Sequence, residues 1–442
     1  MFNIPPKLRV PLAVLATLFL LLLTVNIPTI WPKIANRLDT VRTQIVYLIN
    51  PPDKAVFIPG QSTPAATPPT TATPSPKKTA TPGPTVAPTI TSTPLPKAAT
   101  LPGVVYVDQH NRWNYCGPAN LTMALNFWGW KGTRDDVAKV VKPGENDPKL
   151  DFIQRGKSDK NVMPYEMVDF VNTETEYSAF QRFGGTMDLL KAFISNGLPV
   201  LIEKGYYERD YTGKVTWMGH YLFVTGYDDA QGVFIVQDAY LKPGKDLQVK
   251  YDEFDQGWRS FNYLFMLIYP DTMQNTVESI AGDYMDMDSS ARIALARANQ
   301  EVENTEGMEA FFSWFNKGTS HVQLAEYFDA AAAFDKAFQI YAALNEEDIQ
   351  RPYRMMWYQT APYKAYYYTQ RYQDVIALAN TTLLETLDKP TLEESLFWRA
   401  MAELAMENKY AGVADLQQAV YYNPNMAIAL NKLAELNAST VP

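Results

Sequence analysis

The chain has 442 residues, a length that predicts more than one folded unit. Hydrophobic residues make up 47% and charged residues 20%, which is typical of globular protein. The net charge of −9 argues against a general nucleic-acid binder, which would present a basic field. One cysteine and three histidines exclude an internal disulfide framework and a cysteine-ligated zinc site, because both need several such residues.

The first predicted element is an apolar run from Val10 to Val25 that follows Lys7 and Arg9. A positive segment before an apolar run is typical of an export signal. Extended to Trp31, the run approaches the ~20 residues that span a bilayer. No small-x-small cleavage site follows it, so we expect a retained transmembrane anchor, with a cleaved signal peptide as the alternative.

Thr, Pro, Ala and Ser dominate the chain from Gly60 to Pro102. Such a segment buries too little to offset its ordering entropy, and its prolines favour an extended spacer. Positive residues flank the apolar run on both sides, so charge alone does not choose an orientation. Because Thr/Pro stalks are common outside cells, we expect a single-pass protein of the cell membrane with extracytoplasmic folded domains.

The lone cysteine, Cys116, precedes a predicted helix. Pro118 suits the first turn of a helix, and apolar residues then recur at helical spacing, at Leu121, Ala124, Leu125 and Trp128. Cys116 therefore lies at or just before a helix N-terminus. The helix dipole and the free N–H groups there stabilise a thiolate, the reactive form of the side chain.

Two further side chains suit cysteine chemistry. Gln109, upstream of Cys116, could donate its amide to a developing oxyanion together with a backbone N–H. His220 begins a β-prone apolar run, and an imidazole titrates near neutrality, as a general base must. His321 lies in the helical part of the chain and is interpreted as a surface or core residue.

Asp238 ends the next predicted strand, at the distance of a β-hairpin partner from His220. A carboxylate beside the imidazole would fix its tautomer and stabilise its charged form. Asp228 and Asp229 are weaker candidates for this orienting role. His110 is a weaker candidate for the base, because it lies on the loop of the nucleophile.

The order of Gln109, Cys-Gly-Pro-Ala at 116–119, Gly-His-Tyr at 219–221 and a strand ending in Asp238 resembles the papain-like cysteine peptidases of family C thirty-nine. These include domains that cut bacteriocin leader peptides after a double glycine. The resemblance covers about residues 104–270 and implies an α+β fold, in which a helix carrying the nucleophile packs on an antiparallel sheet. It implies four roles: nucleophile Cys116, base His220, orienting residue Asp238 and oxyanion donor Gln109. The Gly-x-x-x-x-Gly-Lys-Ser/Thr loop of an ATP-driven transporter does not occur, so the substrate stays open.

From about Ala281 the pattern is helical. Its spacing resembles tetratricopeptide repeats in three places, around 314–337, 372–379 and 400–424. Three units suffice for a stable stack, and a plain helical bundle is the alternative. Tyrosines at 363–368 could line a groove for a protein partner, although aromatic residues at helical spacing more often belong to a core.

The sequence thus predicts four segments: 1–32 as cytoplasmic tip and anchor, 33–103 as stalk, 104–270 as peptidase domain and 281–440 as helical repeats. The predicted function is a cysteine endopeptidase acting on a peptide or protein, without a cofactor or metal. The alternatives are an acyl transferase that uses the same thioester chemistry and a non-catalytic peptide-binding module on a helical scaffold.

Overall fold

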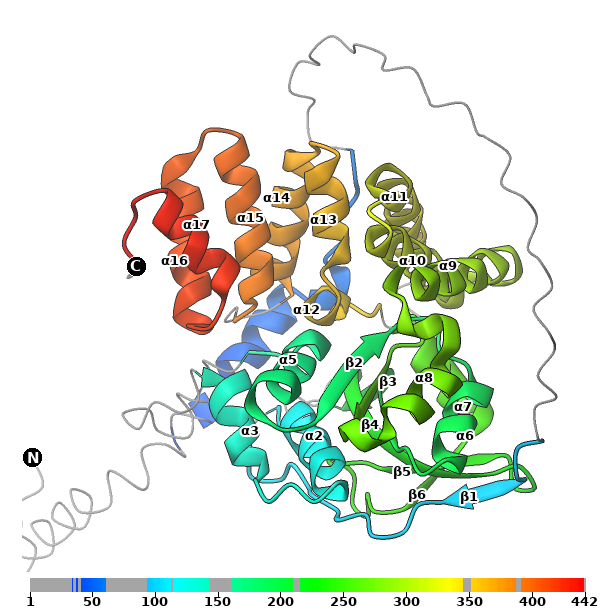
Figure 1. The fold of residues 1–442 in the computed structure, drawn as a ribbon. Helices are drawn as coiled ribbons and strands as arrows, with labels where there is room; N and C mark the ends of the chain where they lie inside the picture. The colour runs from blue at the N-terminus through cyan, green and yellow to red at the C-terminus, as the bar shows by residue number, and fades with distance from the viewer. Residues whose placement is uncertain are drawn as a thin grey trace, which may run out of the picture.

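The computed structural model describes residues 34, 37–38, 41–60, 94–112, 114–143, 160–209, 215–344, 351–386 and 391–440. Figure 1 shows an α+β part built on one sheet, and an all-helical part that follows it in the chain and packs beside it. The helix α12 (Met355–Tyr358) lies where the two parts meet.

The sheet has seven antiparallel strands, and the order β2-β7-β3-β4-β5-β6 forms its main path. The seventh strand, β1, pairs with the end of β4 that extends beyond β3. The strands are β1 (Ala98–Thr100), β2 (Ser178–Arg182), β3 (Val200–Arg209), β4 (Val215–Asp228), β5 (Val233–Gln237), β6 (Leu247–Lys250) and β7 (Phe265–Tyr269).

Helices cover both faces of this sheet because side chains alternate between the faces along each strand. Leu201, Tyr221 and Phe223 join a core with α2 (Cys116–Phe127), α3 (Arg134–Val141) and α5 (Pro164–Glu174). Their neighbours Val200, Leu222 and Val224 join a second core with α6 (Met187–Ser195), α7 (Tyr251–Arg259) and α8 (Gln274–Ala281). Short 3-10 turns follow at η3 (Asp271–Met273) and η4 (Gly282–Met285).

The all-helical part consists mainly of paired helices. It comprises α9 (Met287–Asn304), α10 (Gly307–Gln323), α11 (Tyr327–Ala343), α12, α13 (Ala361–Tyr368), α14 (Tyr372–Asn380), the π-turn η5 (Thr381–Glu385), α15 (Glu393–Ala405), α16 (Lys409–Tyr422) and α17 (Ala427–Glu435). A Cβ at Gly318 would lie 2.6 Å from Phe334, and one at Gly412 would lie 2.6 Å from Leu404, so glycine permits the close approach of α10 to α11 and of α15 to α16. The helical region is therefore present, while its assignment to tetratricopeptide repeats stays a prediction.

The predicted tyrosine cluster of this region does not act as one surface. Tyr363 and Tyr366 are fully buried and belong to the core of the helical region. Tyr368 is 51% exposed and stacks on Tyr327 with ring centroids 4.5 Å apart. Half of the cluster is therefore unavailable to line a groove.

One part of the predicted fold class is wrong, namely the transmembrane helix. A spanning helix needs ~20 predominantly apolar residues, and none of the described helices is both long and apolar enough. The longest described helices, α9, α10 and α11, have 18, 17 and 17 residues and carry charged side chains. The predicted anchor at 1–32 lies outside the described residues. The corrected fold class is an α+β domain followed by a helical region.

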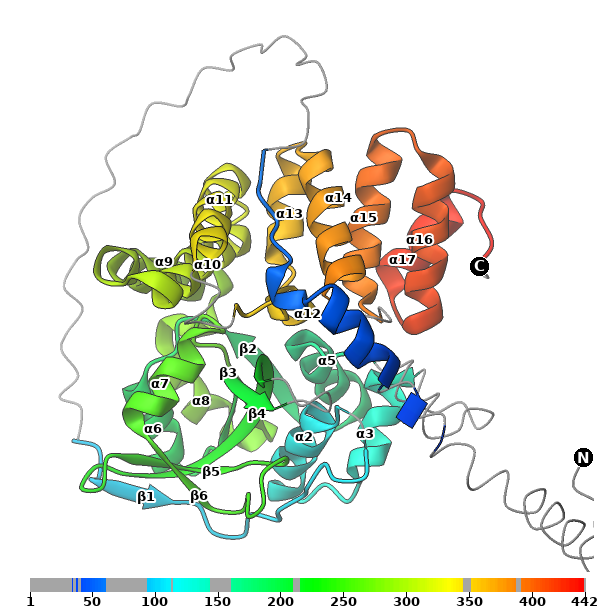
Figure 2. The same cartoon turned by 180° about the vertical axis from the view of Figure 1, so that it is seen from behind.

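The segment predicted as a stalk is packed at both of its described ends. Phe57, just after the turn η1 (Pro52–Lys54), is 5% exposed and contacts Phe338 and Tyr366 with ring centroids 5.1 and 5.9 Å away. Figure 2 shows this blue segment running along α13. At the other end, β1 extends the sheet. The folded structure therefore includes residues well before 104, because short apolar stretches there find partners.

Candidate active site

Cys116 is the first residue of α2, where the sequence placed it. Asn120, one turn later, donates to the Cys116 carbonyl at 2.9 Å and to the Tyr221 carbonyl at 3.1 Å. This buried amide ties the first turn of the helix to β4. The Tyr221 backbone N–H donates in turn to the Cys116 sulfur, so the thiol lies at the junction of helix and sheet.

The imidazole of His220 is held between the thiol and a carboxylate. Its Nε2 lies 2.9 Å from Oδ1 of Asp238, and both side chains are almost fully buried. The imidazole also interacts with Cys116, since each side chain shifts the pKa of the other. The backbone N–H groups of Tyr240 and Leu241 donate to the same Asp238 oxygen at 2.8 and 3.1 Å, which fixes the carboxylate.

These contacts favour a thiolate and an imidazolium. Burial opposes ionisation of the Asp238 carboxyl, but the charge and hydrogen bond of His220 outweigh it and lower the pKa of Asp238 to about 2. Burial also opposes the imidazolium, yet the charge and hydrogen bond of Asp238, with a contribution from Cys116, raise the pKa of His220 to about 10. The pKa of Cys116 is lowered: burial opposes this, but the hydrogen bond and charge of His220 outweigh it.

The structure places the weaker candidates elsewhere. His110 directs Nε2 at the Tyr240 carbonyl, 2.9 Å away, and has no hydrogen bond to Cys116 in the described part of the chain. Asp228 accepts hydrogen bonds from Ala230 and Gln231 in the turn after β4. Asp229 pairs with Lys191 at 2.7 Å. Neither carboxylate orients His220.

Gln109 lies beside this group without joining it. Its backbone N–H donates to the carbonyl of Ala239, the residue after Asp238, at 2.8 Å. Its side-chain oxygen is buried and has no hydrogen-bond partner among the described residues. The structure thus brings Cys116, His220 and Asp238 together, and it places the Gln109 backbone next to them with an unengaged amide oxygen.

Sequence reasoning missed Glu203, which lines a pocket beside Cys116. Glu203 lies opposite Tyr221 in the pairing of β3 with β4 and is 3% exposed. Burial, followed by the negative thiolate, raises the pKa of Glu203 well above its usual range, which favours the neutral acid. The sequence contains one feature that could have drawn attention to Glu203: it is an acidic residue directly after the apolar run Val200–Ile202.

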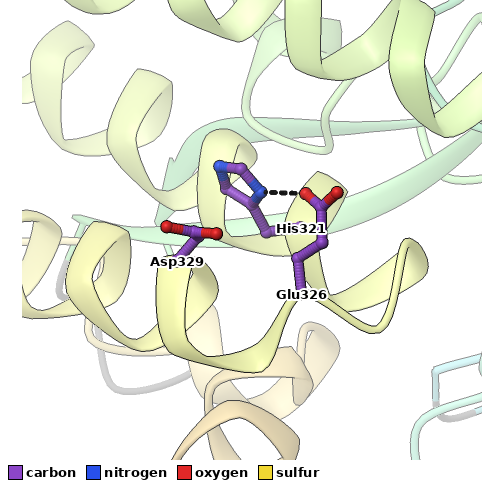
Figure 3. A group of neighbouring side chains, drawn as sticks. All are labelled: His321, Glu326 and Asp329. Carbon is purple, nitrogen blue, oxygen red and sulfur yellow. Dashed lines mark hydrogen bonds and ion pairs between the residues drawn. The ribbon is translucent and has the colours of Figure 1, made fainter. Parts of the chain in front are cut away.

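One cluster in the helical region offers metal-ligand atoms: His321 at the end of α10, Glu326, and Asp329 in the first turn of α11. Figure 3 shows the imidazole facing Glu326, with Nδ1 and Oε2 2.7 Å apart. Two atoms that bind one tetrahedral zinc are about 3.3 Å apart, so this spacing fits a hydrogen bond better than shared ligation. We therefore interpret the pair of His321 and Glu326 as a structural hydrogen bond at the end of α10.

The α+β part of the chain is similar to known proteins. Residues 102–266 match the model of the Peptidase_C39 like family. No curated protein matches the chain. Among solved structures, a candidate C39-like peptidase from Bacillus anthracis is 17% identical with a TM-score of 0.30, covering 39% of this chain and 96% of its own. Xylellain, a cysteine protease from Xylella fastidiosa, is 17% identical with a TM-score of 0.27, covering 40% of this chain and 87% of its own.

The family match supports a cysteine peptidase fold for the α+β domain, as the sequence motifs implied. It begins at residue 102 and ends within β7, and so includes the strands and helix that carry Cys116, His220 and Asp238. The match does not distinguish the leader-processing type, which stays a prediction.

Proposed function

We propose that the protein is a cysteine endopeptidase with Cys116 as nucleophile, His220 as general acid and base, and Asp238 as the residue that orients the imidazole. The observation that carries the proposal is the grouping of Cys116, His220 and Asp238: the imidazole pairs with Asp238 at 2.9 Å, and it interacts with the thiol strongly enough to lower the thiol pKa. A surface histidine or a core cysteine would have no need of such a grouping. Its electrostatics favour the ionised couple that thiol peptidases use.

The chemistry follows from the positions of these groups. The Cys116 thiolate attacks the scissile carbonyl carbon, and the imidazolium of His220 gives its proton to the leaving amine. The acyl group is then bound to the sulfur as a thioester. Neutral His220 next takes a proton from water, which attacks the thioester, and cleavage returns the thiolate. Asp238 holds the ring and stabilises its charge in both half-reactions.

The oxyanion of each tetrahedral intermediate needs hydrogen-bond donors. The backbone N–H of Cys116 lies in the first turn of α2, where N–H groups have no partner within the helix. We assign the second donor to the amide of Gln109. Its side-chain oxygen has no hydrogen-bond partner among the described residues, so that oxygen does not tie the amide group to another part of the site.

The lone cysteine makes a direct test possible, because alkylation of any thiol in the chain is alkylation of Cys116. We expect rapid labelling by iodoacetamide below the ordinary thiol pKa of about 8.5, and slow labelling at that pH in His220→Ala. Mass spectrometry of a peptide library incubated with the protein should show hydrolysis products that the Cys116→Ala variant does not form.

The outcomes separate the three functions considered. Slow labelling with an ordinary thiol pKa, together with peptide binding but no cleavage, would favour a binding module and overturn the peptidase. Products joined to an added amine in place of hydrolysis products would indicate acyl transfer by the same thioester.

A further inference from the structure

The pocket beside the nucleophile is built from both parts of the molecule. Its walls include Cys116, Gly117, Glu203, Gly219 and Tyr221 from the α+β domain, and Tyr358 from α12 of the helical region. It offers about 10 Å³ to a water-sized molecule, which is close to the smallest space that holds one water. A residue of the helical region therefore helps to decide what can lie next to the sulfur.

Tyr358 is held in this wall by packing against β4. A Cβ at Gly219 would lie 2.9 Å from the Tyr358 ring, so glycine at 219 makes the close contact possible. The ring also meets Trp217 and Phe261 edge-on, with centroids 5.9 and 6.1 Å away. The Gly219 backbone, one residue before the proposed base His220, also acts on the Tyr358 hydroxyl and lowers its pKa.

The residues on either side of Tyr358 are anchored to the α+β domain. Asn161 donates its amide N–H to the Trp357 carbonyl at 2.9 Å. Gln359 donates to the Ser260 carbonyl at 2.7 Å. Because both neighbours are fixed, the tyrosine cannot leave the wall without breaking contacts between the two parts.

The titratable groups of the wall other than Cys116 favour their neutral forms. Burial, as the largest influence, raises the pKa of Glu203 well above its usual range. Burial also raises the pKa of Tyr358 to about 12, so its hydroxyl is neutral at pH 7. A group that enters beside the sulfur meets an acid, two phenols and two glycines in this wall, and we expect its shape to decide whether it fits.

From these contacts we infer that Tyr358 is a specificity-determining residue: the helical region completes the substrate pocket, and the tyrosine ring sets the size of the group admitted beside Cys116. This inference rests on the proposed peptidase function and deepens it. It gives the helical region a role within the site itself.

The test compares alkylation of Cys116 by a small reagent, iodoacetamide, and a bulky one, N-benzyl iodoacetamide. In Tyr358→Ala the ratio of the bulky to the small rate should rise by about tenfold or more, the discrimination that a few carbon atoms give in a packed pocket. Tyr358→Phe should keep the original ratio, because the ring remains. Tyr368→Ala is the matched control: it removes a half-exposed tyrosine of the same region that does not line the pocket.

An unchanged ratio in Tyr358→Ala would overturn the inference, as would the same rise in Tyr368→Ala. If Tyr358→Ala does not fold, judged by its melting temperature, Tyr358→Leu carries the same comparison, because it also replaces the ring by a shorter side chain.

A second readout separates this inference from the proposed function. With peptides that differ in side-chain size next to the scissile bond, Tyr358→Ala should raise kcat/KM for the larger ones relative to the smaller. If the protein cleaves peptides but neither ratio changes, the inference fails and the peptidase stands. If the protein cleaves no peptide, the proposed function fails, and the alkylation ratio still decides whether Tyr358 bounds the pocket.

Discussion

The charge on a single residue, His220, depends on the carboxylate beside it. Asp238 raises the pKa of the imidazole, and the imidazolium in turn lowers the pKa of the Cys116 thiol. The ion pair is therefore present above the lowered thiol pKa and is lost as the pH rises through the imidazole pKa of about 10. Activity should be bell-shaped between these limits.

We expect Asp238→Asn to narrow this bell from its alkaline side. Without the anion the imidazolium loses its proton at lower pH, whereas the acid limb depends on a thiol beside an imidazole that is still protonated there and should not move inward. The alkaline limb should fall by on the order of one pH unit or more, measured by iodoacetamide labelling of Cys116 against pH. Asp228→Asn, a carboxylate on β4 that does not contact His220, is the control. Equal profiles in the wild type and Asp238→Asn would contradict the assigned role.

Gln109→Ala should affect catalysis without affecting the nucleophile. Loss of one oxyanion donor typically lowers kcat about 10²- to 10³-fold. The rate of Cys116 alkylation should stay close to that of the wild type, because the Gln109 side chain makes no hydrogen bond to the thiol or imidazole. Steady-state kinetics and labelling on the same sample test this. A parallel loss of both would show that Gln109 shapes the site and does not serve the oxyanion.

The residues of the site differ in how far sequence could reveal them. Cys116 and His220 lie in short contiguous motifs, and Asp238 directly follows β5, so local pattern and the chemistry of the side chains were enough to select them as candidates. Glu203 and Tyr358 carry no local motif. Glu203 faces Cys116 only because of the register of β3 on β4, and Tyr358 reaches the pocket only because α12 docks there.

At the scale of elements, a buried lysine joins the helices of the two parts. Lys160, 1% exposed, contacts Glu166 of α5 at 2.6 Å and Glu393 of α15 at 3.2 Å. The two carboxylates raise the pKa of Lys160 despite its burial, so it is charged in the folded protein. This ion-paired group fixes α15 to the domain that carries Cys116.

Lys160→Met should therefore be strongly destabilising, because it leaves two carboxylates buried without a cation. We expect a loss of about 3–5 kcal/mol in the free energy of unfolding at pH 7, measured with urea. The loss should shrink toward acidic pH: burial, against the charge of Lys160, already raises the pKa of Glu393 to about 7, and a protonated acid needs no counter-charge.

The exposed Lys139, which pairs with Asp136 on α3, supplies the control. Lys139→Met should change stability by less than about 0.5 kcal/mol, as surface substitutions usually do. If Lys160→Met is no more harmful than Lys139→Met, the buried group does not hold the two parts together.

The folded part of the molecule includes more of the chain than the sequence indicates. The Thr/Pro-rich stretch from Gly60 predicts a stalk, and the predicted stalk segment also took in the preceding Phe57, an aromatic residue whose partners Phe338 and Tyr366 are far away in the chain. The composition of a segment indicates how much apolar surface that segment has, but it does not show whether distant parts of the chain offer a surface on which its side chains can pack. The start of the helical region could be predicted, because helical periodicity is a local signal.

Phe57→Ala should cost about 3–5 kcal/mol in the free energy of unfolding, the range for removing a buried phenylalanine. The adjacent Ile58 is 40% exposed, so Ile58→Ala is a control of nearly equal position and should cost much less. Thermal and urea unfolding of the full chain measure both. Equal losses of stability in Phe57→Ala and Ile58→Ala would mean that packing of the Phe57 ring against the helices contributes little to the free energy of unfolding.

The ring contacts at Trp217 bear on how the protein can be dissected. Trp217 stacks on Phe261 of its own domain and also meets Phe312 of α10 and Tyr358 of α12. A recombinant fragment that stops after the last strand would expose the rings of Trp217 and Phe261 to water as a hydrophobic patch. Proteins with such an exposed patch tend to self-associate. Poor solubility of such a fragment would follow from the cut itself, and inactivity measured on it would say little about the intact protein.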